Sequence, residues 1–226
     1  MIVAVFLTCK SNVEESITEN KDTYESLVGV FKYPNENLPK ISVHRGGKGL
    51  VNYPENCLET LEFVDSKINA IYEIDVAKTS DNKLVLMHDN TLERTTTGQG
   101  VLEKQTFNAL QDYFLKDDFG NVTAFKIPLF KAVLQWAKAH QVILTIDIKK
   151  SVALGDVIDA IREVKAESIS IIITYDVDAA KAAHALAPDL LLSVSARNEQ
   201  EWQWMLDSDI PLDRMLAFTG TRLSDV

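Results

Sequence analysis

Four short apolar runs of the sequence carry ionisable side chains at or near their C-terminal ends. These side chains are His44 and Arg45 after 41–43, Glu73 and Asp75 in 71–76, His88 after 84–87, and Asp147 and Lys149 at the end of 142–149. Burying so many charged groups near each other is costly unless they pair or bind a cation. The four runs together therefore predict a functional site.

The acidic residues of these runs are suited to a metal ion. Glu73, Asp75 and Asp147 offer carboxylate oxygens, which are the ligands that hard divalent cations prefer. A tetrahedral zinc site would draw more on Cys or His, and neither Cys9 nor Cys57 lies in the runs. We expect one divalent cation, either Ca²⁺ or Mg²⁺.

The remaining residues are suited to acid–base chemistry on a phosphate ester. His44 and His88 have ordinary pKa values near neutrality, which fits a general base and a general acid. Arg45 and Lys149 are fixed cations that would stabilise a phosphoryl group as it gains charge. The sequence lacks a Gly-rich nucleotide loop, a G-x-S-x-G elbow and a CxxC pair. The set therefore favours phosphodiester cleavage over acyl transfer or redox chemistry.

The elements that position these residues alternate along the chain. Strands are predicted at 41–43, 71–76, 84–87, 142–148, 169–174, 190–194 and 215–218. Amphipathic helices are predicted at 56–68, 128–140 (with Pro128 in the first turn), 155–166, 177–187 and 198–206. Such alternation predicts parallel strands joined by helical crossovers, an α/β fold that places sites at the carboxyl ends of its strands.

The motifs of residues 44–98 resemble a known family. They are His44-Arg45-Gly46, Pro54-Glu55-Asn56, Glu73-Ile74-Asp75-Val76, His88-Asp89, Leu92, Arg94-Thr95-Thr96 and Gly98. In order and spacing they resemble the signature of glycerophosphodiester phosphodiesterases, and Ile146-Asp147-Ile148-Lys149 is similar to the next acidic strand of that family. The resemblance implies a TIM barrel and metal-dependent hydrolysis of a small-molecule glycerophosphodiester to glycerol 3-phosphate and an alcohol.

The resemblance also implies a role for each matched residue. His44 and His88 would be the acid–base pair, and Arg45 and Lys149 would bind the phosphate. The metal ligands would be Glu73, Asp75 and Asp147, with Glu55, beside Arg45, as a further candidate ligand. Direct water attack and a cyclic intermediate both remain open, as do the head group, the choice between Ca²⁺ and Mg²⁺, and the oligomeric state.

Two other functions are compatible with the sequence. A phospholipase-D-like lyase on the same scaffold would act on lysophospholipids and leave a cyclic phosphate. A non-catalytic relic would bind glycerophosphodiesters without turning them over. The retained histidines and acidic residues favour the hydrolase over the relic.

Length and charge limit the fold and the partners. The chain has 226 residues and a formal net charge of −10, which disfavours binding to a nucleic-acid backbone. No run of about 18 apolar residues is present, so no transmembrane segment is expected. A (β/α)₈ barrel takes about 250 residues. Residues 41–226 are therefore predicted to form a TIM-type (β/α)₈ barrel that is incomplete at its C-terminus, with about seven strands.

The first 40 residues are predicted to be a lead-in segment outside this domain. Met1–Cys9 is apolar, and Leu7-Thr8-Cys9 resembles a bacterial lipoprotein cleavage box whose signal lacks its positively charged front end. On this interpretation Cys9 carries a lipid anchor and the protein is exported, either periplasmic or a lipoprotein. The alternative is a short N-terminal strand in a cytoplasmic protein.

Overall fold

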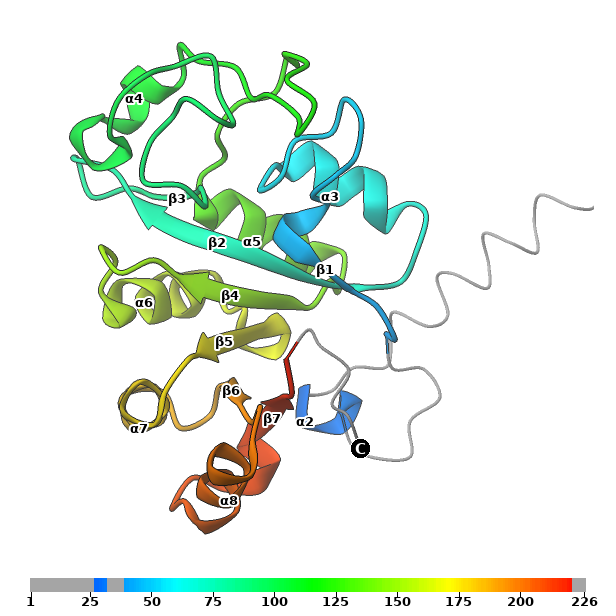
Figure 1. Cartoon of the computed structure of the whole chain (residues 1–226), viewed down its shortest axis with the longest axis vertical. Helices are drawn as coiled ribbons and strands as arrows, with labels where there is room; N and C mark the ends of the chain where they lie inside the picture. Colours follow the sequence, from blue (N-terminus) through cyan, green and yellow to red (C-terminus); the bar gives the residue numbers. More distant parts are fainter. Residues whose placement is uncertain (1–26, 32–38, 221–226) are drawn as a thin grey trace, which may run out of the picture.

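The computed structural model describes residues 27–31 and 39–220 (Figure 1). Cys9 and most of the predicted lead-in segment lie outside the described residues. The described strands are β1 (Ser42–Val43), β2 (Ile71–Lys78), β3 (Leu84–Leu86), β4 (Leu144–Ile148), β5 (Ser170–Thr174), β6 (Leu191–Ser195) and β7 (Met215–Phe218). Each of the seven predicted strands is thus confirmed in place.

Six of these strands form a continuous parallel path. Their order is β1-β2-β4-β5-β6-β7, and every neighbouring pair on this path is parallel. β3 is the exception, because it pairs antiparallel with the end of β2. The prediction that all strands are parallel was therefore wrong for β3. Only residues 79–83 join β2 to β3, which is too short for a helical crossover and long enough for a turn.

The helices follow the predicted alternation. The longer ones are α3 (Leu58–Asp65), α5 (Phe130–Ala139), α6 (Leu154–Val164), α7 (Val177–Leu186) and α8 (Glu199–Asp207), and the short ones are α2 (Leu27–Val30) and α4 (Phe107–Leu110). Single 3-10 turns lie at η1 (His44–Gly46), η2 (Leu102–Lys104), η3 (Glu167–Ile169) and η4 (Leu212–Arg214). Pro128 was expected in the first turn of α5, but the helix begins two residues later, after its N-cap Leu129.

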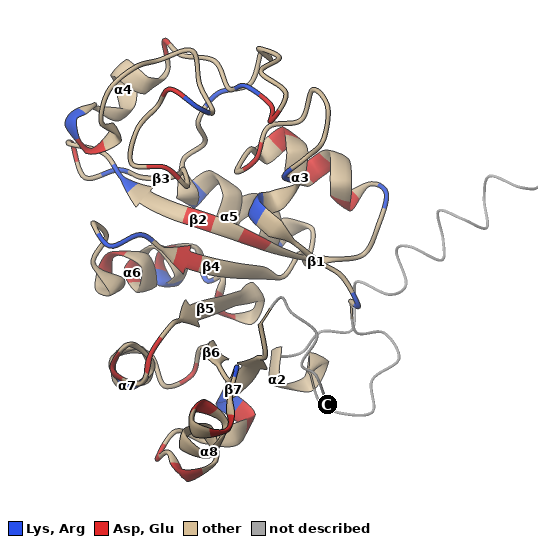
Figure 2. Ribbon diagram, in the orientation of Figure 1, with Lys and Arg blue, Asp and Glu red and all other residues tan. Residues whose placement is uncertain are grey.

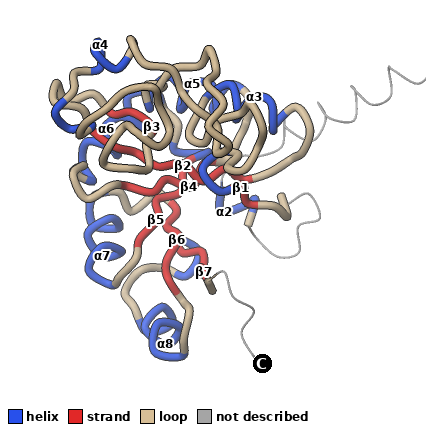
Figure 3. Tube along the Cα trace, turned by 45° about the horizontal axis from the view of Figure 1, so that its top comes forward, coloured by secondary structure: helices blue, strands red, loops and turns tan. Residues whose placement is uncertain are grey.

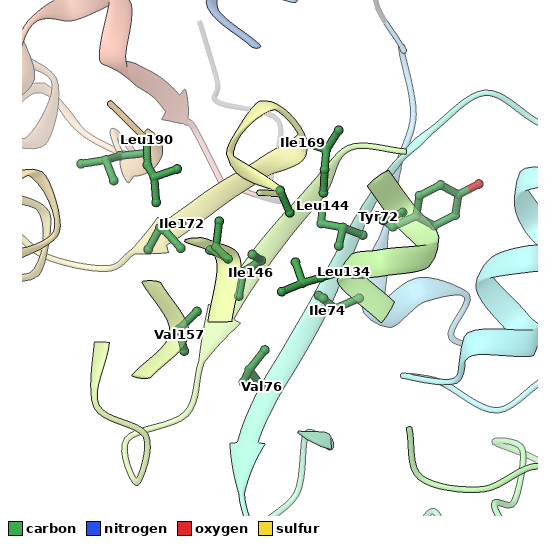
Figure 4. Close-up of a cluster of buried hydrophobic side chains, with 14 of the residues drawn as sticks. Tyr72, Ile74, Val76, Leu134, Leu144, Ile146, Val157, Ile169, Ile172 and Leu190 are labelled. Carbon is green, nitrogen blue, oxygen red and sulfur yellow. The ribbon is translucent and has the colours of Figure 1, made fainter. Parts of the chain in front are cut away.

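The main core lies between the sheet and its covering helices. Along β2, the apolar residues Tyr72, Ile74 and Val76 alternate with Glu73 and Asp75, so the two sets face opposite sides of the sheet. The apolar set packs in one buried cluster with residues of α5 and α6, such as Leu134 and Val157 (Figure 4). The same cluster includes residues of α7 and α8. This burial leaves the opposite, concave face for the acidic residues.

The helix α2 covers the concave face at the end where the parallel strands begin. Leu27 and Val30 are buried in a separate cluster with apolar residues at or next to the starts of the strands, namely Ile71, Ile143, Ile171, Leu191 and Leu216. These residues share the face of Glu73 and Asp147 but lie toward the other ends of the strands. The helix therefore closes the floor of the concave face, and the polar residues lie above it.

The sheet curls as the strands proceed from β1 to β7 (Figure 3). With helices outside and a concave face inside, the described residues form an arc of a TIM-type barrel, as predicted. Within residues 39–220, β1 and β7 are the two edges of the parallel path and do not pair with each other. Among the described helices, none is long and apolar enough to cross a membrane.

Candidate active site

Three carboxylates converge on the concave face. Asp75 of β2 and Asp147 of β4 are paired in register, and Glu73 lies two residues before Asp75 on the same face. One oxygen from each of the three lies within 4.8 Å of the others. Figure 2 shows the acidic bands on β2 and β4 side by side. The predicted metal ligands are thus brought together by strand register alone.

Lys149 contacts this acidic cluster from the end of β4. Its Nζ lies 2.5 Å from Oδ1 of Asp75 and 2.7 Å from Oδ2 of Asp147. Burial acts to lower the pKa of Lys149, but the hydrogen bonds to Asp147 and Asp75 outweigh it and the pKa is raised. Lys149 is therefore a charged partner of the carboxylates.

The loop after β1 brings Arg45 to the same cluster. Its backbone N–H donates to Oε2 of Glu73 at 2.6 Å, and its φ of 52° is in the left-handed region. The guanidinium Nε lies 3.9 Å from Oδ2 of Asp75 and, within the described chain, is buried without a hydrogen-bond partner. Gly46 follows in a left-handed conformation, where a Cβ would lie 2.8 Å from Cδ2 of Leu61. The turn thus needs a glycine directly after Arg45.

Asn56 holds this loop against β2. Its side-chain amide donates to Oδ2 of Asp75 at 2.6 Å, and its Oδ1 accepts from the Asp75 backbone N–H at 2.9 Å. Its own backbone N–H donates to the carbonyl of Arg45 at 2.7 Å. Asn56 is buried and has a φ of 53°. It therefore positions both a carboxylate and the arginine loop, a role that was not predicted from the sequence.

The two predicted catalytic histidines approach the acidic strand β2 by different routes. His44 follows β1, and its Nε2 lies 4.0 Å from Oε2 of Glu73. Burial, and then the charge of Arg45, lower the pKa of His44, so its imidazole favours the neutral form. His88 follows the antiparallel strand β3, which runs back along β2 so that the Met87 N–H donates to the Asp75 carbonyl. The hairpin thus brings His88 next to the acidic strand.

His88 and Arg45 are connected through a network of charged residues. His88 Nδ1 lies 2.7 Å from Oδ1 of Asp89, and Asp89 accepts from Arg94. Arg94 also donates to buried Glu55, which in turn accepts from Arg45. Burial acts to raise the pKa of Glu55, but the hydrogen bond from Arg94 and the charge of Arg45 outweigh it and the pKa is lowered. Glu55 is thus held by two guanidinium groups, and its role as a metal ligand stays a prediction.

A pocket of about 440 Å³ opens beside the acidic cluster. It is lined by Ser42, His44, Glu73, Ile173, Thr174, Tyr175, Ser193, Ser195 and Phe218. Burial, and then the negative charge of Asp147, raise the pKa of Tyr175. The pocket extends from the ionisable groups across the concave face of β5, β6 and β7. It offers space for a small organic group next to a phosphate.

The environment of Glu73 is strongly anionic. Burial, followed by the charge of Asp75, raises the pKa of Glu73 to about 7. Ionising a third carboxylate in this position is unfavourable unless positive charge is present. The cluster is therefore suited to a bound cation.

The structure brings together most of the predicted site residues. Glu73, Asp75 and Asp147 converge, Lys149 and Arg45 each contact members of this cluster, and His44 adjoins Glu73. His88 and Glu55 connect to this group through Asp89 and Arg94.

No role was predicted from the sequence for Asn56, Arg94 or Tyr175. Asn56 and Arg94 occur in the motifs quoted for the resemblance, so their spacing was the available signal. Tyr175 directly follows the predicted strand 169–174.

This combination of fold and site defines a class of protein: TIM-type α/β proteins with an acidic centre, flanked by His, Arg and Lys, on the concave face of the sheet. The model of the glycerophosphoryl diester phosphodiesterase family matches residues 44–208, and the chain belongs to this family. The predicted resemblance is thereby confirmed.

Individual relatives agree with this assignment. The structure of a glycerophosphoryl diester phosphodiesterase from Parabacteroides distasonis ATCC 8503 is similar with a TM-score of 0.81 and 34% identity, covering 87% of this chain and 68% of that one. A glycerophosphodiester phosphodiesterase from Bacillus altitudinis is 35% identical over 118 residues, 51% of this chain and 47% of that protein. An Oleispira antarctica phosphodiesterase, solved with its product sn-glycerol-3-phosphate, shares the fold with a TM-score of 0.62 and 23% identity, over 81% of this chain and 85% of that one.

The matched regions cover only part of some relatives. For three of the curated proteins that the chain matches, between 46% and 65% of the relative's length is covered.

Proposed function

We propose that this protein hydrolyses glycerophosphodiesters to glycerol 3-phosphate and an alcohol, using one divalent cation. The observation that carries the proposal is the convergence of Glu73, Asp75 and Asp147 within 4.8 Å, next to Arg45 and Lys149. Membership of the phosphodiesterase family supports it.

The donor set fits a hard cation. Three carboxylates offer oxygen ligands, and burial, followed by the negative charge of Asp75, raises the pKa of Glu73, so a nearby cation would favour its ionised form. Glu73, Asp75 and Asp147 would hold the ion, either Ca²⁺ or Mg²⁺. When bound, such a cation supplies charge neutralisation and polarisation of a phosphoryl oxygen.

Two cations of the chain would bind the phosphate. Lys149 lies on the carboxylate pair, and the Nε of Arg45 is a buried donor without a hydrogen-bond partner among the described residues. A phosphate oxygen would satisfy this donor and remove the cost of leaving it unpaired. Both groups would stabilise the charge that the phosphoryl oxygens gain in the transition state.

The two histidines would move the protons. His44 favours the neutral state, which suits a base that takes a proton from the attacking hydroxyl or water. His88 would donate a proton to the departing alcohol, with Asp89 holding its Nδ1. The pocket beside Glu73 and Tyr175 would accommodate an organic group of the diester.

The test is release of glycerol 3-phosphate from glycerophosphocholine, with and without a chelator. Activity should disappear on chelation and return with Ca²⁺ or Mg²⁺, and His44→Ala and His88→Ala should retain only a small residual rate while still binding the cation in calorimetry. A phosphorus NMR signal from a cyclic phosphate as the end product would support the lyase instead. Binding of diester and cation without any turnover would support the relic.

A further inference from the structure

Arg94 occupies a central position among the charged groups around His88. Its Nε donates to Oδ2 of Asp89 at 2.6 Å, and its Nη2 donates to Oδ1 of Asp89 at 2.9 Å. The same guanidinium donates from Nη2 to Oε1 of Glu55 at 2.6 Å and from Nη1 to Oε2 at 3.1 Å. Arg94 therefore makes paired hydrogen bonds to two different carboxylates at once.

We propose that Arg94 is a positioning residue that fixes the imidazole of His88 through Asp89. The inference rests on the proposed function, in which His88 transfers a proton, and it assigns no direct contact between Arg94 and the substrate.

The anchor of this arrangement is Glu55. Its side chain is only 3% exposed, whereas that of Arg94 is 41% exposed and that of Asp89 is 25% exposed. Glu55 is further held by Arg45, whose Nη1 lies 3.1 Å from its Oε1. The guanidinium of Arg94 is thus fixed on its buried side, and Asp89 is held in turn by a donor that cannot easily rotate.

The consequence for His88 concerns the location of its proton. Oδ1 of Asp89 lies 2.7 Å from Nδ1 of His88 and accepts its proton, so Nδ1 keeps that proton in both forms of the ring and Nε2 is the nitrogen that releases the transferred proton. Without Arg94, the carboxylate of Asp89 could rotate away from His88. Paired hydrogen bonds from a planar guanidinium prevent this rotation, and a lysine ammonium cannot donate in the same paired geometry.

A third carboxylate, that of Asp118, also lies near Arg94. Besides Asp89 and Glu55, Oδ1 of Asp118 lies 3.7 Å from Nη1, and the hydrogen bond from Arg94 is the largest cause of the lowered pKa of Asp89. Asp118 also accepts from the Gly49 backbone N–H, so it ties the loop after β1 to the same region.

The experiment compares Arg94→Lys with a matched control, Arg162→Lys. Arg162 also pairs with two carboxylates, Glu167 and Asp189, and its side chain is 38% exposed, but none of these residues belongs to the site. Arg94→Lys should lower kcat for glycerophosphocholine by about 20-fold or more with KM changed by less than about threefold, because proton transfer and not binding is impaired. Arg162→Lys should leave both within about twofold.

A double-mutant cycle with His88→Ala tests the route of the effect. If Arg94 acts through His88, Arg94→Lys should change the residual rate of His88→Ala by less than about twofold. Nitrogen NMR of His88 should show the Nδ1–H form in the wild type and in Arg162→Lys, and a mixture of tautomers in Arg94→Lys. Equal losses in both backgrounds, or an unchanged tautomer, would overturn the proposal.

A second variant covers the case in which Arg94→Lys does not fold. Asp89→Asn leaves the Arg94–Glu55 pair in place and should give the same loss of kcat and the same change in the His88 signal. If the wild type has no phosphodiesterase activity, the proposed function fails, while the NMR comparison still decides whether Arg94 positions His88. If the wild type is active and Arg94→Lys and Asp89→Asn behave like Arg162→Lys, only the positioning role fails.

Discussion

Asp75 and Asp147 lie directly opposite each other on β2 and β4, and the Nζ of Lys149 lies 2.5 Å from one carboxylate and 2.7 Å from the other. The same two side chains are also predicted cation ligands. Their oxygens are therefore shared between a fixed internal cation and the proposed divalent ion. This sharing makes Lys149 the most informative residue of the cluster to replace.

Lys149→Met should separate cation binding from turnover. Without the competing ammonium charge, the affinity for Ca²⁺ or Mg²⁺ in calorimetry should rise by about tenfold, which is about 1.4 kcal/mol. The release of glycerol 3-phosphate should fall by about 100-fold or more, because the phosphate loses a counter-charge.

The matched control for Lys149→Met is Lys78→Met, at the end of the same strand as Asp75. Lys78 lies 3.5 Å from Asp156 on the surface, so its replacement should change neither quantity. Weaker cation binding by Lys149→Met would contradict this expectation. It would show that Lys149 helps to position the carboxylates and does not compete with the ion for them.

Asn56→Ala should lower the free energy of unfolding by about 2–4 kcal/mol, because it removes two buried hydrogen bonds to Asp75. Its left-handed backbone adds strain for alanine but not for glycine. Asn56→Gly should therefore lose less stability in urea unfolding, while both variants lose cation affinity to the same extent. Equal stability of the two variants would mean that the backbone conformation at this position contributes little.

Cys57 should make stability depend on pH in the alkaline range. Burial raises the pKa of its thiol from 9.0 to about 12, so the folded state keeps the proton where the unfolded state loses it. The contribution is present below pH 9 and is lost as pH rises toward 12. Between about pH 8 and pH 10 the wild type should lose about 1.4 kcal/mol more unfolding free energy than Cys57→Ala.

The comparison should be made in a Cys9→Ala background, so that Cys57 is the only thiol that titrates. Identical pH slopes for the two proteins would contradict the predicted burial of the thiol.

Leu27→Ala should destabilise the whole domain. Leu27 is 5% exposed and packs with residues at the floor of the concave face, so its truncation should cost about 2–4 kcal/mol in urea unfolding. Val28→Ala, which alters a half-buried neighbour on the same helix, should cost less than about 1 kcal/mol. If the two variants unfold alike, α2 does not contribute to the core.

Much of this architecture could be predicted because it depends on local patterns. The apolar runs located all seven strands, and charged residues within them located the acidic cluster. The direction of β3 was missed because an apolar run does not reveal its orientation; the five-residue connection 79–83 does. That connection also explains how His88 reaches the site although it does not end a parallel strand.

Other parts of the site depend on contacts between distant residues. The motif spacing singles out Asn56 but does not reveal its role, which depends on its contact with Asp75 of β2. The two carboxylate partners of Arg94 are 5 and 39 residues away. The packing of α2 likewise has no signal in residues 27–30, because its apolar partners lie at or next to the starts of five strands. Such roles follow from the tertiary structure and not from the local sequence.

The position of α2 has a consequence for the order in which the parts of the domain fold. Leu27 and Val30 pack near Leu191 of β6 and Leu216 of β7, so residues from near the start of the chain complete a cluster with its last described strand. During synthesis α2 cannot complete this packing until β6 and β7 have left the ribosome. Contacts of such large sequence separation form slowly, because a long loop has to close first. The floor of the concave face is therefore expected to close late in folding, after the strands that carry the acidic cluster have paired.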